Sequence, residues 1–194
     1  MGIETDEKAD GALCTAFAGD RRIASGPLRD VALAVKAAMD RDDGAAILIF
    51  DDATSRPVEV DFRGTSEEVL RRLAPVDAEP RRPGRPRLGV VAREVTLLPR
   101  HWDWLASQPG GASVALRKLV EDARRLGGGA DRVRQSQDAA YRFMAAMAGD
   151  RPGFEEAARA LFARDKARFE VEIGPWPADL RDHAGKLASA AFAG

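Results

Sequence analysis

The spacing of apolar residues divides the first part of the chain into short elements. Alternating apolar residues predict strands, because successive side chains of a strand point to opposite faces, and a recurrence every third or fourth residue predicts helices. The predicted elements, in order, are a hairpin at 12–24, a helix at 27–39, strands at 46–50 and 58–62, and a helix at 65–73. Thr65 and Glu68 fit a capping box at the start of the last helix. Residues 12–74 are therefore interpreted as a small ββαββα unit with an antiparallel sheet.

The two segments that flank this unit differ from it in composition. Four prolines between Pro75 and Pro86 exclude a regular helix or a central strand, so residues 75–89 are predicted to be an extended, Pro/Arg-rich linker. Residues 1–11 are acidic and polar, and they are predicted to be a disordered tail.

The rest of the chain is predicted to be mainly helical. Residues 90–126 combine a β-rich segment, a turn at Pro99, a short helix, a glycine break and a second amphipathic helix. Three glycines at 127–129 predict a flexible joint, and three helical patterns follow within 130–194. We therefore expect an α+β protein with an N-terminal ββαββα unit, a basic linker, a strand followed by two helices, and a helical C-terminal unit.

Composition narrows the class of protein further. The 194 residues are 45% hydrophobic and 31% charged, which is typical of a globular protein. The single cysteine, Cys14, excludes a disulfide framework and a cysteine-rich zinc site, and two histidines far apart in sequence predict no metal site. Because no apolar run approaches the roughly 18 residues of a membrane span, we expect a cytoplasmic protein that does not contact a membrane.

Motifs for catalysis are missing from the sequence. It contains no nucleophile elbow, no phosphate-binding loop and no calcium loop. The acidic runs at 40–43 and 51–52 are interpreted as a solvated helix end and a loop. We therefore expect no enzymatic activity, no catalytic residue and no cofactor.

The predicted linker resembles an AT-hook, whose Arg-Gly-Arg-Pro core lies in the minor groove of A·T-rich DNA. Gly84, Arg85 and Pro86 match this core, whereas Pro83 stands where its first arginine belongs. Proline keeps the backbone extended, glycine allows close approach, and arginines are attracted by the negative potential of the narrow groove. The resemblance implies DNA contacts from Arg81, Arg82, Gly84, Arg85 and Arg87. The alternative is a solvated linker.

Residues 90–126 resemble a ribbon-helix-helix fold, in which strands from two chains pair into a ribbon that reads the major groove. The resemblance implies a homodimer in which Arg93, Val95 and Leu97 face the groove and the start of the second helix, at Ser113, faces phosphate. Valine and leucine make no bidentate base contact, so these positions depart from the pattern of the family. The alternative is an ordinary strand and helical hairpin packed on the rest of the protein.

Charge is distributed unevenly along the chain. With 30 basic and 31 acidic residues the net charge is −1, which by itself argues against a nucleic-acid partner. Residues 81–100 nevertheless carry six arginines and one acid, whereas residues 1–80 carry 10 basic and 17 acidic side chains. The local charge of +5 supports phosphate contact by counterion release, and the alternative is neutralisation by the chain's own carboxylates.

Five runs of sequence carry one further resemblance: Thr15–Gly19, Gly84–Pro86, Val95–Leu105, Gly110–Ser113 and Trp176–Pro177. Together they resemble a bacterial family known as domain of unknown function 2239. The resemblance covers nearly the whole chain from Thr15 onward. It implies a bacterial, cytoplasmic, single-copy architecture and supplies no established activity.

These observations favour a homodimeric DNA-binding protein, either a transcriptional regulator or a nucleoid-associated factor, with an A·T-rich minor groove as the target of the linker. The alternative hypothesis is a non-enzymatic protein-interaction or dimerisation module that does not bind DNA. Pairing of Arg85 with N-terminal carboxylates favours the alternative, and a free Arg85 repeated across a dimer favours DNA.

Overall fold

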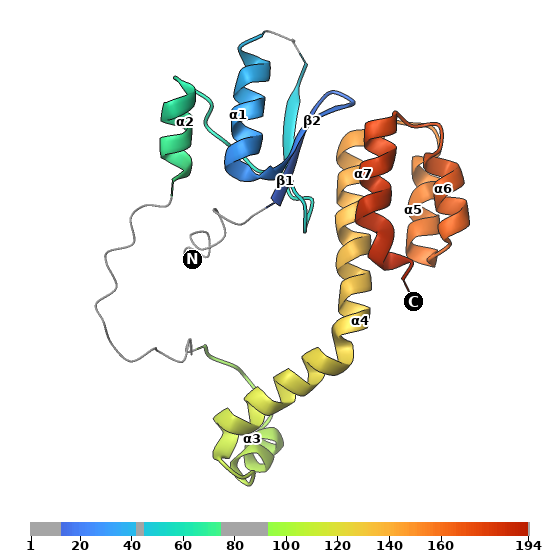
Figure 1. Ribbon diagram of the computed structural model, residues 1–194. Coiled ribbons are helices and arrows are strands. Elements are labelled where there is room, and N and C mark those ends of the chain that lie inside the picture. Colours follow the sequence, from blue (N-terminus) through green and yellow to red (C-terminus); the bar gives the residue numbers. More distant parts are fainter. Residues whose placement is uncertain (1–12, 42–44, 75–92, 194) are drawn as a thin grey trace. The chain divides into compact units, whose positions relative to one another are not determined.

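The computed structural model describes residues 13–41, 45–74 and 93–193 (Figure 1). The chain divides into two units, one formed by residues 1–77 with 132–194 and the other by residues 78–131. The tail predicted at 1–11 and the linker predicted at 75–89 lie outside the described residues.

The first unit combines a three-stranded antiparallel sheet with helices, so the α+β class is confirmed. The strand order is β2-β1-β3, with β1 in the centre. Its elements are β1 (Leu13–Ala18), β2 (Arg21–Pro27), α1 (Leu28–Met39), β3 (Ile47–Asp51), α2 (Ser66–Leu73), the C-terminal part of α4, α5 (Phe154–Ala163), α6 (Lys166–Ile173), α7 (Ala178–Ala188) and the 3-10 helix η1 (Ser189–Ala191).

The central strand β1 is buried on both faces. Cys14 and Ala16 point to one face, where they pack with Val31 and Val35 of α1. Phe17 points to the other face and joins a second core cluster made largely of C-terminal residues. Because each face meets a different layer, alternation along β1 separates two cores instead of a core from solvent.

The C-terminal helices supply most of this second cluster. The ring centroid of Phe143 in α4 lies 5.3 Å from that of Phe17 and 5.4 Å from that of Phe50 in β3. The Nε1 of Trp176 donates a hydrogen bond to the Pro152 carbonyl at 3.0 Å. Helices that the sequence assigns to a separate unit at 130–194 thus share one core with the sheet that it assigns to 12–74.

The second strand predicted after α1, at 58–62, is not formed in the structure, so the ββαββα order is not confirmed. The segment makes one bridge to β3, between Pro57 and Phe50, and the Val58 amide donates to the Ile49 carbonyl at 2.8 Å. Proline has no amide hydrogen to donate, which limits pairing at this point. Beyond Val58 the segment still buries apolar side chains against the sheet, among them Val60 and Phe62.

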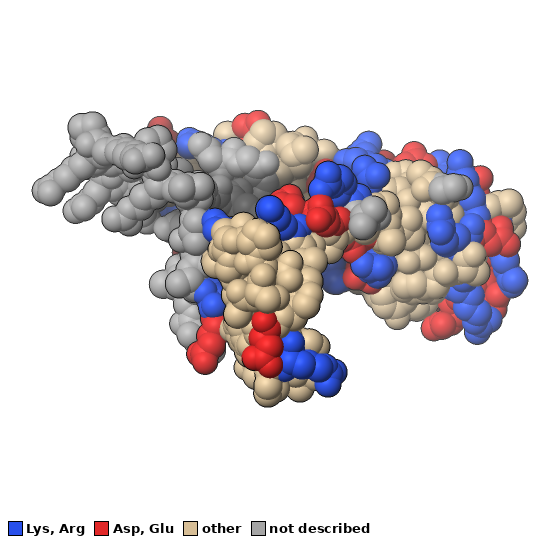
Figure 2. Space-filling view, turned by 90° about the horizontal axis from the view of Figure 1, so that it is seen from below, with Lys and Arg blue, Asp and Glu red and all other residues tan. Residues whose placement is uncertain are grey.

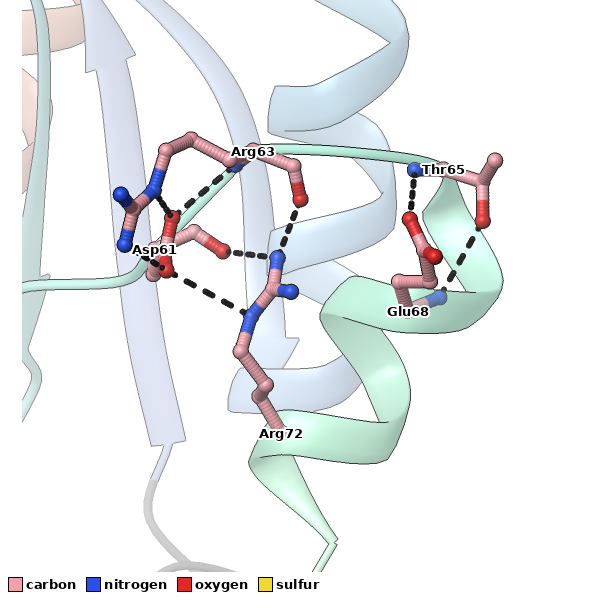
Figure 3. Close-up of polar contacts among 5 residues, drawn as sticks. All are labelled: Asp61, Arg63, Thr65, Glu68 and Arg72. Atoms are coloured by element: carbon pink, nitrogen blue, oxygen red, sulfur yellow. Dashed lines mark hydrogen bonds and ion pairs between the residues drawn. The ribbon is translucent and has the colours of Figure 1, made fainter.

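Polar contacts fasten α2 to the segment that precedes it (Figure 3). The carboxylate of Asp61 accepts hydrogen bonds from the backbone amide and the guanidinium of Arg63, and these bonds hold the pKa of Asp61 well below its usual value. Arg72 donates to the Asp61 carbonyl at 2.8 Å. The predicted capping box is confirmed, because the Thr65 side chain accepts from the Glu68 amide at 3.3 Å and the Glu68 carboxylate accepts from the Thr65 amide at 2.9 Å.

Replacing Gly64 with alanine is expected to destabilise the first unit by about 1–2 kcal/mol. Gly64 has φ +82°, and a Cβ atom there would overlap the Glu68 carboxylate that completes the capping box. Urea unfolding measures the change. The matched control is Gly19→Ala, because Gly19 has φ +53° and open space around its missing Cβ. Equal losses for the two variants would show that only backbone strain matters at Gly64.

The described part of the second unit contains α3 (Pro99–Ala106) and the N-terminal part of α4 (Gly111–Ala148). Pro99 occupies the first turn of α3, where a proline is tolerated because no intrahelical partner awaits its missing amide hydrogen. Residues 93–98 are not a strand in the structure, so the strand expected there is not confirmed.

The three glycines predicted as a flexible joint at 127–129 do not interrupt the helix, because α4 is a continuous helix of 38 residues that includes them. Each glycine costs roughly 1 kcal/mol of helix stability relative to alanine, which weakens a helix without ending it. Strong helix formers on both sides of the three glycines allow the backbone hydrogen bonds to continue. α4 also begins at Gly111, two residues before the N-cap predicted at Ser113.

Candidate functional site

The residues predicted to contact DNA fall into two groups. Five of them lie outside the described residues: Arg81, Arg82, Gly84, Arg85 and Arg87. Arg93 and Ser113 are described, and both are exposed on the second unit. The distinction between a paired and a free Arg85 therefore falls outside the described residues. The cations of the second unit that the structure does describe are considered next.

Arg93 and Arg100 bracket the non-helical residues that lead into α3. Both side chains are exposed, and neither has an ion-pair or hydrogen-bond partner within 13–41, 45–74 or 93–193. Two arginines of α4 differ, because Arg124 pairs with Glu121 at 3.1 Å and Arg125 pairs with Asp122. The guanidinium groups at the entry to α3 are thus available to an anionic partner, whereas those farther along α4 are partly neutralised.

Ser113 lies in the first turn of α4. The Gly111 amide donates to the Gln108 carbonyl at 2.9 Å. Ala112 and Ser113 follow Gly111 in this first turn, where the amides of a helix have no intrahelical carbonyl to bond. Free amides at a helix start favour anions, because they combine hydrogen-bond donors with the positive end of the helix dipole.

Apolar exposure is the most pronounced feature of the second unit. Among its described residues only Leu105 and Ala115 are buried apolar side chains. Six large apolar side chains are between 40% and 54% exposed: Val95, Leu98, Trp102, Trp104, Leu119 and Val120. Figure 2, seen from below the view of Figure 1, shows tan areas without charged side chains among the described residues. We refer to these six residues as the apolar surface.

Part of this surface follows the helical repeat of α4. Leu116, Leu119, Val120 and Ala123 recur at the spacing that places side chains on one face of a helix. The ion pairs of Arg124 and Arg125 lie at neighbouring positions of the same helix. The amphipathic pattern was visible in the sequence, but its exposure was not, since a stripe of this kind normally covers the core of its own domain.

Buried titratable groups of the first unit do not form a catalytic arrangement. His183 is 1% exposed, its ring lies 4.6 Å from that of Phe143, and neither ring nitrogen has a hydrogen-bond partner among the described residues. Burial lowers the pKa of His183 to about 4, and it raises the pKa of Cys14 to about 11 with help from Asp51 and Asp52. A neutral imidazole and a protonated thiol, both enclosed, are suited to packing.

The described residues also bear on metal binding and on membrane insertion. No group of three or more histidine, cysteine, aspartate or glutamate side chains in 13–41, 45–74 or 93–193 is placed to hold a metal ion. Within the same residues, no helix has both the length and the apolar character that crossing a bilayer requires.

Comparison with known proteins identifies one match. A family model described as "Uncharacterized protein conserved in bacteria (DUF2239)" matches residues 13–188. No curated protein and no solved structure matches the chain. The match spans both units, including α3 and α4.

Proposed function

Because the chain belongs to the uncharacterised bacterial family DUF2239, its function must be argued from its own residues, and we propose that it is a homodimeric DNA-binding protein. In this proposal the second unit associates with the second unit of another copy, and its arginines contact DNA. The protein would act as a transcriptional regulator or a nucleoid-associated factor. The observation that carries the proposal is the apolar surface, which lies on the same small unit as the free arginines.

Dimerisation is supported by how little the described part of the second unit buries on its own. The two buried apolar side chains found there are too few to stabilise a helical hairpin, and segments of this size usually need an additional stabilising partner. A second copy would cover Trp102, Trp104 and Leu119 by an isologous contact, in which the same surface serves both chains. In the ribbon-helix-helix arrangement, residues 93–98 would also find their strand partner in that copy, because the ribbon forms only between two chains.

DNA contact is supported by charge that has no partner in the described chain. Arg93, Arg100 and the free amides at the start of α4 belong to one unit. The sequence adds Arg82, Arg85 and Arg87 to the same unit, close in sequence to Arg93. In the proposal these three engage the minor groove, while Arg93 and the amides near Ser113 contact phosphate.

A DNA titration tests the proposal. The full-length chain is titrated with a fluorescent A·T-rich duplex at about 50 and about 200 mM salt, and the affinity is expected to fall as salt rises. Replacing Arg82, Arg85 and Arg87 together by alanine is expected to weaken binding at least ~10-fold and to reduce the salt dependence by about three phosphate contacts.

The charge-matched control replaces three cations of the first unit by alanine, namely the exposed Arg159 and Lys166 and the half-buried Arg181. This variant is expected to bind DNA as the parent does. Absence of salt-sensitive binding, or equal losses in the two triple variants, would overturn the proposed DNA contact.

The alternative function is a dimerisation or protein-docking module that does not bind DNA. The apolar surface supports it directly, since hydrophobic association needs none of the arginines. A parent chain that dimerises through this surface and binds neither A·T-rich nor G·C-rich duplex would favour this alternative.

A further inference from the structure

β3 is an outer strand of the sheet, and part of its free edge has no partner. All residues of β3 lie opposite residues of β1, and in an antiparallel pair the backbone groups of alternate residues point toward and away from the partner strand. Because Ile49 bonds to Val58 on the outer side, the backbone groups of Ile49 and of Ile47 point away from β1. The Ile49 carbonyl accepts from the Val58 amide at 2.8 Å. Within the described residues, the amide and carbonyl of Ile47 and the amide of Ile49 have no hydrogen-bond partner.

The opposite edge of the sheet is protected differently. There the Arg22 amide of β2 donates to the Asp179 carboxylate, at the start of α7, at 2.8 Å. Arg151 also pairs with Asp20 beside the β1–β2 turn, at 2.5 Å. Covering an edge with a helix end and charged groups prevents another strand from adding to it. The edge of β3 beyond Ile49 has no comparable cover among the described residues.

An apolar groove lies beside this open edge. It encloses a volume of about 550 Å³ between α1, β3 and the segment 57–62, and it occurs where the fourth strand expected from the sequence is not formed. Its lining includes Val35, Met39, Leu48, Val60 and Phe62. The groove therefore combines free main-chain groups with space for apolar side chains.

Among the described residues, the one charged residue that lines the groove is Glu59. Its side chain is exposed, and it has no ion-pair partner in the part of the chain that the structure describes. A carboxylate at the rim of an apolar groove favours an occupant with a positive charge beside its apolar groups.

We propose that the edge of β3 and this groove bind an extended peptide segment of a partner protein, with apolar side chains in the groove and a lysine or arginine near Glu59. The main chain of the peptide would add a strand beside Ile47 and Ile49, which is the established physical mode of β-strand addition. A compact apolar ligand would fill the volume but would leave the three backbone groups of β3 unpaired, whereas an extended peptide satisfies both. This peptide site is independent of the DNA and dimer contacts proposed for the second unit.

The test uses the full-length chain and a capped synthetic hexapeptide of alternating valine and threonine that ends in lysine. Binding is followed by amide shifts in ¹H–¹⁵N NMR spectra and by fluorescence anisotropy. We expect saturable binding, with shifts at Ile47, Ile49 and Glu59, and slower hydrogen exchange at the first two amides. The same peptide with alternate amides N-methylated is expected to bind at least ~10-fold more weakly, because it cannot complete the ladder.

Two protein variants separate main-chain from side-chain recognition. Ile47→Pro removes an outward amide at the first position of an edge strand, where proline is tolerated, and Ile47→Ala removes the side chain alone. We expect the proline variant to bind the peptide at least ~10-fold more weakly than the alanine variant. Glu59→Lys is expected to reverse the preference to a peptide that ends in glutamate.

Several results would overturn the proposal. They are no peptide binding up to the solubility limit, equal binding by the N-methylated peptide, and amide shifts confined to residues away from β3. Pairing of the β3 edges of two copies, which would prevent the peptide from binding, would also contradict the proposal. Because all these measurements concern the first unit, their failure leaves the DNA titration unaffected.

Discussion

Replacing Leu119 by glutamate and Val120 by lysine together is expected to abolish dimerisation. These side chains are 46% and 54% exposed in the single chain, and the proposed dimer buries them between two helices. A charge buried without a partner costs several kcal/mol, and apolar residues at the centre of an interface usually dominate its stability. We expect the dissociation constant of the dimer to rise at least ~100-fold, or about 3 kcal/mol. The double replacement leaves the net charge unchanged.

Sedimentation equilibrium of the parent and the variant over a range of concentrations measures the effect, and circular dichroism verifies that α4 stays helical. Val171→Glu is the matched control, because Val171 is a valine of α6 in the first unit that is 72% exposed. A parent chain that stays monomeric at high concentration would contradict the dimer. A dimer that tolerates the double replacement as well as Val171→Glu would place the interface elsewhere.

Acidification from about pH 7.5 to about pH 5 is expected to lower the free energy of unfolding by about 2 kcal/mol through His183 alone. Burial lowers the pKa of His183 to about 4 in the folded chain, below its usual value of 6.5. Asp52 acts against this shift, whereas Lys186 and Arg22 reinforce it. Between these two pKa values the unfolded chain binds a proton that the folded chain rejects, so stability falls as the pH falls. Above about pH 7.5 both states leave the imidazole neutral, and the residue contributes almost no pH dependence.

Urea unfolding at several pH values measures this loss, and His183→Phe is expected to remove it. Phenylalanine suits the site, because the rings of Phe17 and Phe143 lie 5.3 and 4.6 Å from the imidazole ring. The imidazole nitrogens also have no hydrogen-bond partner among the described residues that phenylalanine would fail to replace. The free energy of unfolding of the His183→Phe variant near pH 7.5 is expected to stay within about 1 kcal/mol of that of the parent. The removal of two unsatisfied nitrogens offsets the added side-chain volume. His183→Leu tests the same point with a smaller side chain.

His101→Phe is the control variant, because it replaces the exposed histidine of α3 and leaves the buried surroundings of His183 intact. A pH dependence that survives in both His183 variants would show that other groups cause the loss. The range between pH 7.5 and pH 5 is chosen because most carboxylates stay ionised there.

The sequence by itself determined the elements whose formation is local. The β1–β2 hairpin, α1 and the capping box of α2 were predicted close to their observed positions. Each depends on residues within a few positions of one another, such as Thr65 and Glu68. Short-range periodicity and capping record such contacts directly.

Tertiary structure decided the elements that depend on distant partners. Residues 58–62 alternate as a strand does, yet they form no strand, and the only bridge made to β3 here is that of the preceding Pro57. Pairing along an edge depends on the neighbouring chain as well as on alternation. The glycines at 127–129 suggested a joint, but the helical residues on both sides of them continue α4. Most of the side chains that cluster with Phe17 come from beyond residue 131, a separation that no local pattern encodes.

The candidate surfaces follow the same division. The sequence identified the arginine cluster, and it identified the apolar stripe of α4 as one face of a helix. Only the tertiary structure showed that α3 leaves Leu119 and Val120 of that face exposed, and that the edge of β3 remains partly unpaired beside a groove. An amphipathic pattern reports that a face must be buried, whereas the packing of the whole chain decides whether the same chain or another molecule covers it.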